Sequence, residues 1–592
     1  MNHRSSSRLD RREFLKLGGA ALVGLAAGCT LRKRAGTLPA ELMTQPTLAK
    51  TVPPFNTPAP QGPPSGVADM ILKSGKVFTV DAGNSIAQAV AVKDGLLQAV
   101  GSDEAIGALA GPQTQIIDLV GRAASPGFID PHIHFRAWGL QNTYYMAFMP
   151  PDVTDIPGLQ KRLAELLKTK PAGEWVMAYY LVLKDKSIPT KEDLDPVSPN
   201  NPVFIMHIGG HWGTANSAAL QLAGVDKNTQ SPSGGIIEKD KSGELTGVLY
   251  NHRAMDVVRR FAPQITTEMI SQSTLDTQKA FTICGVTSFQ DNNIRAVQDI
   301  EAYQQLTRDG QLVMRNDLYL TLEYPADLAK LDQVQHVNDQ VTRFAGYKFL
   351  IDGQVPTSYC HQPHNGASWE MPTWEPAAFK QVVRTLHDTG LQICVHSIGD
   401  AAADLVLDAY EEAMNANPRS DPRHRIEHAI LTTPQATRRA KDLGVVMSVN
   451  PAFIYVFGIS YESLYGAERM PRIIVTREWL DAGLHVCIGS DAPSMPLYNP
   501  QFTMAGAMSR LTFKETVLGP EQVMTFEEAL RAHTIEAAYA AHEENLKGSL
   551  EAGKLADIVV WPQDPSTLDI ESLAMTTVMD MTIIGGKVVH QV

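Results

Sequence analysis

The stretch PGFIDPHIH occupies residues 126–134. Its apolar residues indicate a buried strand, and the strand ends in two histidines, His132 and His134. Because alternate residues of a strand face the same side, both imidazoles point the same way. Two neighbouring neutral imidazoles suit zinc or a similar divalent metal. The HxH pattern alone also fits two unrelated polar residues at a strand end.

Seven further segments of the chain have the composition of short buried strands. They alternate with helical segments, which is the pattern of a parallel α/β fold. Together with Gly127–His134 they make eight, the number that closes a TIM (β/α)8 barrel, whose active site lies at the C-terminal ends of the strands. The seven segments are Val286–Gln290, Asp317–Leu322, Tyr347–Ile351, Leu391–His396, His424–His428, Val445–Val449 and His485–Gly489.

Three of these segments lead into residues that bind metals or move protons. His396 ends the fifth strand, His428 ends the sixth, and Asp491 follows the eighth. A single histidine at a strand end is more often structural than functional, but these residues converge on one point if the barrel closes. The sequence therefore predicts a metal site that contains His132, His134, His396, His428 and Asp491.

The barrel is expected to occupy residues 126–544, with other units around and within it. Residues 67–125 and 545–592 contain short strands separated by turns, which predicts one small discontinuous β-sandwich domain. Residues 135–265 are too many for a loop after the first strand. We expect this insertion to form a cap over the mouth of the barrel.

Residues 1–28 resemble an export signal, which would not be part of the folded domain. Arg11 and Arg12 begin the RRxFLK core of a twin-arginine signal, and the apolar run that follows is too short to span a membrane. Cys29 stands where a lipoprotein is acylated, and ordinary cleavage with an incidental Cys29 is the alternative. Residues 29–66 are rich in proline and predict a linker. We expect an exported protein of the periplasm or cell envelope that meets the membrane only through a lipid on Cys29.

The composition restricts the partners without naming one. With 51 Lys and Arg against 64 Asp and Glu, the chain carries a formal charge of −13. Nucleic acid binding needs clustered cations, so an acidic chain argues against it. We expect a small-molecule substrate, and the sequence leaves a homodimer open.

The ordered set of motifs resembles the amidohydrolase superfamily, in particular the amidohydrolase-3 branch that includes N-substituted formamide deformylases. The resemblance runs from about residue 68 to residue 590 and includes both flanking β segments. Besides PGFIDPHIH, it is carried by GVTSFQD (285–291), VHSIGD (395–400), RIEHA (425–429) and GSDAP (489–493).

The resemblance implies a centre of one or two divalent metals, with zinc the expected ion. His132 and His134 would hold one metal, and His396 and His428 the other. Lys348 would bridge them after CO2 carboxylates its amine to a carbamate, because an ammonium group cannot bind a cation. The alternative is an uncarboxylated Lys348 that pairs with Asp491 or a nearby carboxylate at a one-metal site.

The resemblance and the general chemistry of such centres also suggest roles for groups around the metals. Asp491 is expected to act as the general base and then the general acid. His211, in a glycine-flanked GGHWG segment, is expected to contact the substrate and stabilise the oxyanion, with a structural turn histidine as the alternative. Glu427 and Asp352 are expected to orient an imidazole or a loop. His361 and His364 lie on a loop near the barrel mouth that departs from the common family form. Selection of the substrate is one role open to them, but we expect both to be solvated.

These assignments predict an exported hydrolase that attacks an amide-type C–N bond with metal-activated hydroxide. Formamides, aryl amides and imides are the candidate substrates. An esterase or lactonase of the same fold is an alternative, because hydroxide attacks either carbonyl. A metal-binding lipoprotein without catalysis is a second alternative, which the presence of Asp491 argues against.

Overall fold

The computed structural model describes residues 62–592, except 150–151, 185–186, 324, 335–337, 355–356, 365–371 and 496. The predicted export signal at 1–28, Cys29 and most of the predicted linker lie outside the described residues. In the part of the chain that is described, no helix has both the length and the apolar composition needed to cross a membrane.

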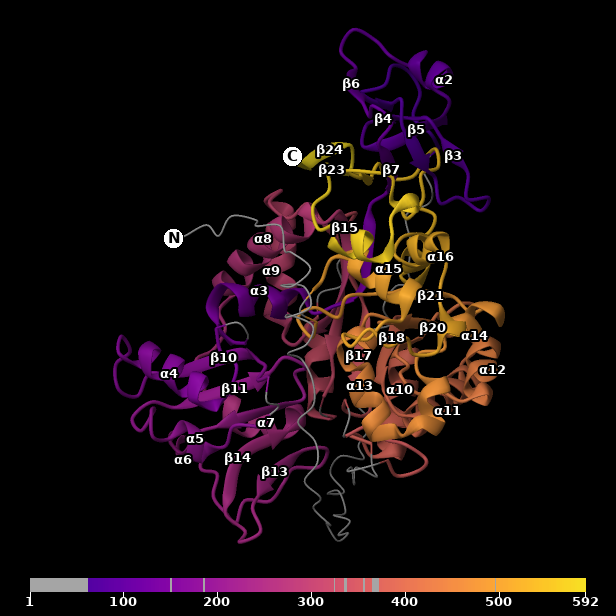
Figure 1. The fold of residues 1–592 in the computed structure, drawn as a ribbon. Coiled ribbons are helices and arrows are strands. Elements are labelled where there is room, and N and C mark those ends of the chain that lie inside the picture. The colour runs from indigo at the N-terminus through magenta and orange to yellow at the C-terminus, as the bar shows by residue number, and fades with distance from the viewer. Residues whose placement is uncertain are drawn as a thin grey trace.

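A single sheet of eight parallel strands forms the centre of the protein (Figure 1). Its strands follow one another in chain order, and each coincides with one of the eight segments predicted from the sequence, which confirms the α/β barrel strands. They are β8 (Phe128–Ile133), β15 (Val286–Ile294), β16 (Arg315–Thr321), β17 (Thr342–Leu350), β18 (Gln392–Ser397), β19 (Arg425–His428), β20 (Val446–Val449) and β21 (Val486–Ile488).

The chain after β21 connects the last strand back to the first. Asp491 N donates to His132 O at 2.8 Å, and His134 N donates to Ala492 O at 2.8 Å. Gly489 is needed at this junction, because a Cβ there would lie 2.9 Å from His132 N. The loop that carries Asp491 is therefore fixed to the strand that carries the HxH pair.

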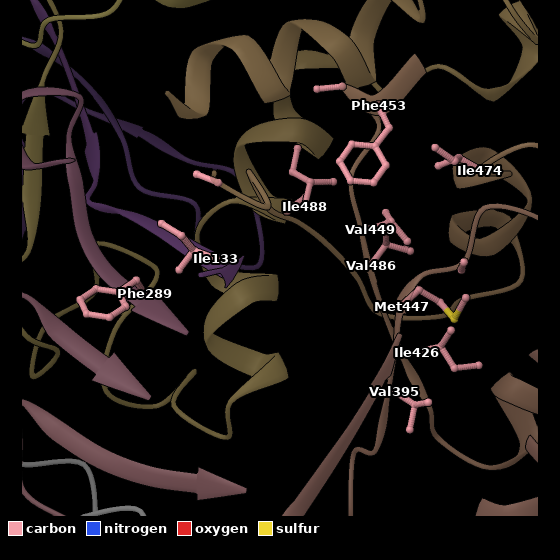
Figure 2. Close-up of a cluster of buried hydrophobic side chains, with 14 of the residues drawn as sticks. Ile133, Phe289, Val395, Ile426, Met447, Val449, Phe453, Ile474, Val486 and Ile488 are labelled. Atoms are coloured by element: carbon pink, nitrogen blue, oxygen red, sulfur yellow. The ribbon is translucent and has the colours of Figure 1, made fainter. Parts of the chain in front are cut away.

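An apolar layer separates the strands from the surrounding helices and holds the barrel together. Figure 2 shows Ile133, Val395, Ile426 and Val449 in this layer, each from a different strand. Their neighbours along the strands face the barrel interior instead, as the period of two requires. Each of these fully buried side chains contributes roughly 1.5–3 kcal/mol to folding.

Helices cover the outside of the barrel. The longer of them present an apolar face inward, as in α10, where Phe379, Val383 and Leu386 are buried. The helices are α8 (Thr267–Ile283), α9 (Val297–Arg308), α10 (Pro376–His387), α11 (Asp400–Ala416), α12 (Pro434–Asp442), α13 (Phe453–Tyr465), α14 (Thr476–Asp481), α15 (Pro500–Ser509), α16 (Phe526–Ala532), α17 (Ile535–Ala540) and α18 (Ile570–Met575). Short 3-10 turns lie at Pro325–Gln333, Ala467–Arg472, Pro520–Gln522 and Pro565–Thr567.

Strands from the two ends of the described chain lie in two small sheets at one end of the molecule (Figure 1). In one sheet β22 pairs antiparallel with β7, so that Val559 faces Ser125. The first sheet contains β2 (Lys76–Phe78), β3 (Ile86–Ala87), β7 (Ala123–Pro126), β22 (Ile558–Val560), β23 (Met581–Ile584) and β24 (Lys587–Gln591). The second contains β1 (Met70–Lys73), β4 (Ala89–Lys93), β5 (Leu96–Gly101) and β6 (Gln115–Asp118), with α2 (Asp103–Gly107) beside it. The domain boundaries expected from the sequence stay a prediction.

The chain between β8 and α8 builds a six-stranded sheet of its own, away from the two small sheets (Figure 1). Before it comes α3 (Phe135–Tyr144), which packs closely on α8, since a Cβ at Gly139 would lie 2.8 Å from Ser273 O. The sheet contains β9 (Met146–Phe148), β10 (Val176–Leu181), β11 (Val203–His207), β12 (Trp212–Ala215), β13 (Ile236–Lys239) and β14 (Leu245–Tyr250). Its helices are α4 (Ile156–Leu167), α5 (Lys191–Leu194), α6 (Ser217–Leu222) and α7 (Asn251–Arg259).

Candidate metal centre

The first group of predicted ligands lies where β8 meets the loop after β21. One ligand atom from each of His132, His134 and Asp491 lies within 4.8 Å of the other two. Asp491 Oδ1 is 2.9 Å from His134 Nε2 and 3.3 Å from His132 Nε2. Within the described chain this buried oxygen accepts no hydrogen bond of good geometry. A buried carboxylate oxygen that faces two imidazoles in this way is suited to share a cation with them.

The second group lies on the adjoining strands of the barrel. The rings of His396 and His428 are 4.6 Å apart between centroids, and the ring of His428 is also 4.6 Å from that of His132. Lys348 Nζ approaches the same point and lies 3.4 Å from His132 Nε2. His396 Nε2 is buried and has no hydrogen-bond partner among the described residues. The structure thus brings together side chains from β8, β17, β18, β19 and the loop after β21.

Hydrogen bonds behind two of the imidazoles fix which nitrogen carries the proton. His132 Nδ1 contacts the carboxylate of Glu427, which can only accept, so the proton of His132 sits on Nδ1. His428 Nδ1 lies 2.7 Å from Asn450 Oδ1, and Asn450 Nδ2 donates to Gly489 O at 2.9 Å. The Nε2 lone pairs of both histidines are therefore left for a metal.

Glu427 links His132 to a buried guanidinium group. Arg425 Nε donates to Glu427 Oε1 at 2.7 Å, and its Nη2 donates to Pro131 O at 2.7 Å and Ser448 Oγ at 3.0 Å. Burial alone would raise the pKa of Glu427. The opposite effect of Arg425 and His132 is larger, so the pKa of Glu427 lies well below its ordinary value. Glu427 therefore stays ionised and orients His132, as expected from the sequence.

Left-handed backbone at two site residues turns their side chains. His428 has a φ of 71° and Asp491 a φ of 52°, in a region that L residues occupy only when the surrounding structure enforces it. In β19, Arg425 and Glu427 face the barrel interior and Ile426 faces the helices, so a regular strand would also send His428 outward. The turned backbone at His428 brings its ring back toward the other ligands.

Burial favours the neutral form of three ligand histidines, His134, His396 and His428. It lowers the pKa of His396 and of His428 well below the ordinary value, and the neighbouring imidazoles add to the effect. Burial also lowers the pKa of Lys348 to about 8. Neutral imidazoles have the lone pairs that metal binding requires, so the histidines and Asp491 form a donor set that fits a divalent metal, and Lys348 would join it only after carboxylation.

Comparison with protein families identifies the family to which this chain belongs. The model described as "Amidohydrolase family" matches residues 115–590, which is most of the chain. The chain belongs to the amidohydrolase family. Membership confirms the sequence-based prediction of a metal-binding hydrolase that acts on carbon–nitrogen bonds other than peptide bonds.

Individual relatives agree with the family assignment over nearly their whole length. An N-substituted formamide deformylase of Arthrobacter pascens is 29% identical over 84% of this chain and 94% of its own. The protein LONG AFTER FAR-RED 3 of Arabidopsis thaliana is 28% identical over 89% of this chain and 92% of its own. The crystal structure of an uncharacterised metal-dependent hydrolase from Pyrococcus horikoshii has the same fold, with a TM-score of 0.69 at 23% identity over 85% of this chain and 99% of its own.

The insertion of this amidohydrolase contributes His211 to the same pocket. His211 precedes β12, and its ring lies 5.2 Å from that of His396. It lines a pocket of about 80 Å³ together with Lys348, His428 and Asp491. Burial lowers the pKa of His211 to about 4, so the imidazole is neutral. The structure places His211 where a substrate contact would be, and its role stays a prediction.

Asp352 supports the loop after β18 and does not ligate. Its carboxylate accepts the backbone N–H groups of Ile398, Gly399 and Tyr359 at 3.0, 2.9 and 2.9 Å. Burial raises the pKa of Asp352 to about 7. The loop that it holds begins directly after the strand with His396.

The two loop histidines have different environments. His361 is 51% exposed and pairs with Asp404 at 2.8 Å, as a solvated histidine does. The expectation that His364 is solvated is wrong, because its side chain is buried against the ring of Tyr465 and Ser358 Oγ. Tyr465 comes from α13, about a hundred residues later in the chain, and no local pattern connects the two.

Sequence reasoning missed two residues of the site. Asn450 follows the seventh strand in the same way as the ligands follow theirs, so its position was a usable signal. His252, at the start of α7, also lines the pocket. No motif singles out His252, because only the folding of the insertion brings α7 to the barrel mouth.

Proposed function

We propose that this amidohydrolase hydrolyses an amide-type C–N bond of a small molecule, such as a formamide, an aryl amide or an imide. One observation carries the proposal: His134, Lys348, His396, His428 and Asp491 line one pocket at the C-terminal strand ends, and His132 lies against several of them. The similarity to an N-substituted formamide deformylase supports this class of substrate.

In this proposal the residues divide into two ligand groups. His132, His134 and Asp491 would hold one divalent metal, with zinc the expected ion, and His396 and His428 would hold a second. Lys348 Nζ lies 3.4 Å from His132 Nε2 and lines the same pocket, so after carboxylation by CO2 it would join the ligands that hold the metals. When bound, such a metal polarises a carbonyl and lowers the pKa of water to about 7.

The remaining steps belong to the side chains. Asp491 is placed to accept the proton of the attacking water and to return it to the leaving nitrogen as the C–N bond breaks. His211 is neutral and lines the same pocket, where it would donate a hydrogen bond to the carbonyl oxygen as charge develops there.

The test is a panel of N-substituted formamides, anilides, cyclic imides and matched esters, assayed with zinc-loaded protein. Turnover of the C–N substrates above the matched esters supports the proposal. Preferential turnover of esters would establish the esterase alternative. Stoichiometric metal binding without turnover of any compound would support a metal-binding protein that lacks catalysis.

A second measurement addresses Lys348. We expect two metals per chain and an intact-protein mass that is greater by one CO2. One metal per chain and an unmodified mass would favour the alternative in which Lys348 remains an amine. A Lys348→Met variant, which keeps an unbranched side chain only one atom shorter and without the amine, should bind fewer metals than the parent.

We also propose that the chain is exported by the twin-arginine route and tethered through residues 29–66. The basis is the RRxFLK motif with Arg11 and Arg12, followed by the apolar run and Cys29. Replacement of both arginines by lysine should keep the protein in the cytoplasm, and Cys29→Ala should release it from the membrane fraction. Unchanged fractionation of the lysine variant would contradict the route, and unchanged fractionation of Cys29→Ala would contradict the lipid.

A further inference from the structure

A second histidine of the insertion, His252, is held by two arginines. His252 Nδ1 lies 3.2 Å from Arg259 Nη2 and 3.3 Å from Arg295 Nη2. A guanidinium group has donors only, so Nδ1 accepts both hydrogen bonds and the proton of the imidazole sits on Nε2. The tautomer of His252 is therefore set by its neighbours.

Both arginines are themselves fixed by carboxylates. Arg259 Nε donates to Asp256 Oδ1 at 3.0 Å, and Arg295 Nη2 donates to Glu323 Oε1 at 2.7 Å. The chain of contacts runs from Asp256 through His252 to Glu323 and joins α7 to the ends of β15 and β16. Burial lowers the pKa of His252 well below the ordinary value, and the two guanidinium groups lower it further.

The His252 side chain is only partly buried, and it lines two adjoining cavities. Nε2 has no hydrogen-bond partner among the described residues, and it is not among their fully buried unpartnered atoms. The side chain lines both the metal pocket and an adjoining cavity of about 380 Å³. Its ring lies 6.1 Å from that of His211. His252 thus presents an N–H donor at the junction of the two spaces.

The adjoining cavity has an aromatic wall and a cationic rim. The rings of Tyr145 and Tyr179 lie 4.6 Å apart on one side. Four arginines and two aspartates line the cavity, and one of the arginines, Arg260, is exposed. Among the residues that line the cavity, cations exceed anions, and Arg260 on the rim is the arginine without a paired carboxylate in the described chain. A flat apolar group with a negatively charged oxygen matches these walls.

We propose that this cavity receives the substituent of the scissile amide and that His252 Nε2–H donates a hydrogen bond to a carboxylate on that substituent. The substrate class is then an N-aryl or N-arylalkyl amide that bears a carboxylate. The inference rests on the proposed function, since it names the substrate of the same metal pocket. His252 is a substrate-binding residue here, and the arginines position it.

The experiment compares two probes, 4-formamidobenzoate and formanilide, which differ only in the carboxylate, on the zinc-loaded full chain. Wild type should prefer 4-formamidobenzoate. His252→Asn keeps an acceptor for the arginines but removes the donor at the Nε2 position, and it should lower kcat/KM for 4-formamidobenzoate about 10- to 100-fold, mainly through KM. For formanilide, which lacks the carboxylate, the loss should be clearly smaller than for 4-formamidobenzoate. His252→Gln, which restores an N–H donor, should recover most of the loss.

An equal loss for both probes in His252→Asn would overturn the proposal, because a merely structural role would not distinguish them. If His252→Asn loses its metal, the substitution Arg260→Gln on the exposed rim of the cavity provides a second test of the preference for 4-formamidobenzoate. We expect it to reduce the preference for 4-formamidobenzoate about 2- to 5-fold, and an unchanged preference would overturn the proposal.

The outcome is separable from failure of the proposed function. If wild type hydrolyses neither probe, calorimetric binding of 4-formamidobenzoate to wild type and His252→Asn decides the question of the cavity alone. Weaker binding to the variant supports the subsite, whereas equal binding or no binding to either protein overturns it.

Discussion

The support of His132 by Glu427 gives the sharpest prediction about the metal centre. Glu427→Gln keeps the shape of the side chain but replaces one carboxylate oxygen by an amide nitrogen. Gln can still accept from Arg425 Nε at 2.7 Å with its one remaining oxygen, but the amide nitrogen cannot accept the proton of His132 Nδ1. The proton of His132 is then free to move to Nε2, where it blocks the lone pair that the metal needs.

Glu427→Gln should lower both the affinity for zinc and the stability of the fold. Removal of a partner that orients a ligand histidine costs about 10- to 100-fold in metal affinity, or roughly 1.4–2.8 kcal/mol. Arg425 is fully buried and loses its counter-charge, which destabilises the fold by about 3–5 kcal/mol when a partner is removed outright. Because Gln retains one acceptor, we expect about 1–3 kcal/mol less free energy of unfolding.

A matched control separates the two effects. Asp557 pairs with Arg315 at 2.8 and 3.1 Å and is also buried, but it lies at the other end of the barrel. Asp557→Asn should lose comparable stability in urea unfolding of the metal-free protein. In a zinc titration against a competing chelator, Asp557→Asn should match wild type and Glu427→Gln should not. Equal zinc affinity in all three proteins would refute the reasoning.

Three further predictions concern chemistry, pH and packing. Asp491→Asn should lower kcat about 10²- to 10⁴-fold while the zinc content falls far less, measured by steady-state assay and metal analysis; a proportional loss of both would contradict a proton-transfer role. His424 accepts the N–H of Ile393 at Nδ1 (3.1 Å), and burial lowers its pKa well below the ordinary value. Protons bind the unfolded chain first, so stability should fall as the pH drops below about 6.5, by up to about 1.4 kcal/mol per pH unit, and His424→Asn should flatten this slope in urea titrations. Gly399→Ala would place a Cβ 1.8 Å from Tyr359 O, so it should cost about 1–3 kcal/mol and weaken zinc binding, whereas wild-type stability would contradict the packing.

The barrel strands could be predicted because their signal is local. Each strand is a short apolar run, and several carry a ligand at or just after their C-terminal end, such as His396 near the end of β18 and Asp491 in the loop after β21. Chain order supplied the rest, since consecutive strands of a barrel are neighbours. The convergence of the ligands followed from the count of strands and required no contact information.

The details that orient the ligands could not be predicted in the same way. The left-handed backbone of His428 interrupts the alternation of side chains along the strand. The sequence does not predict this conformation, because L residues adopt it only when the surrounding fold constrains them. The pairing of Glu427 with both His132 and Arg425 was foreseen only as an orienting role. Its geometry depends on the radius of the closed barrel.

The insertion shows where sequence reasoning ends. The sequence indicated His211 through its glycine-flanked motif. His252 lies at an ordinary helix start, and only its contacts with Arg259 and Arg295 in the structure single it out. The burial of His364 also depends on a partner, Tyr465, from a distant helix. Such contacts are set by tertiary packing, which periodicity and spacing do not record.

We infer that side chains from separate strands hold the metal that this amidohydrolase uses. The most direct test is an anomalous difference map from crystals grown with zinc. The structure predicts a peak at coordination distance, about 2.0–2.2 Å, from His132 and His134 nitrogens and an Asp491 oxygen, and a second peak beside His396 and His428. A zinc-loaded crystal with no peak at these residues, or with peaks only elsewhere, would contradict the account.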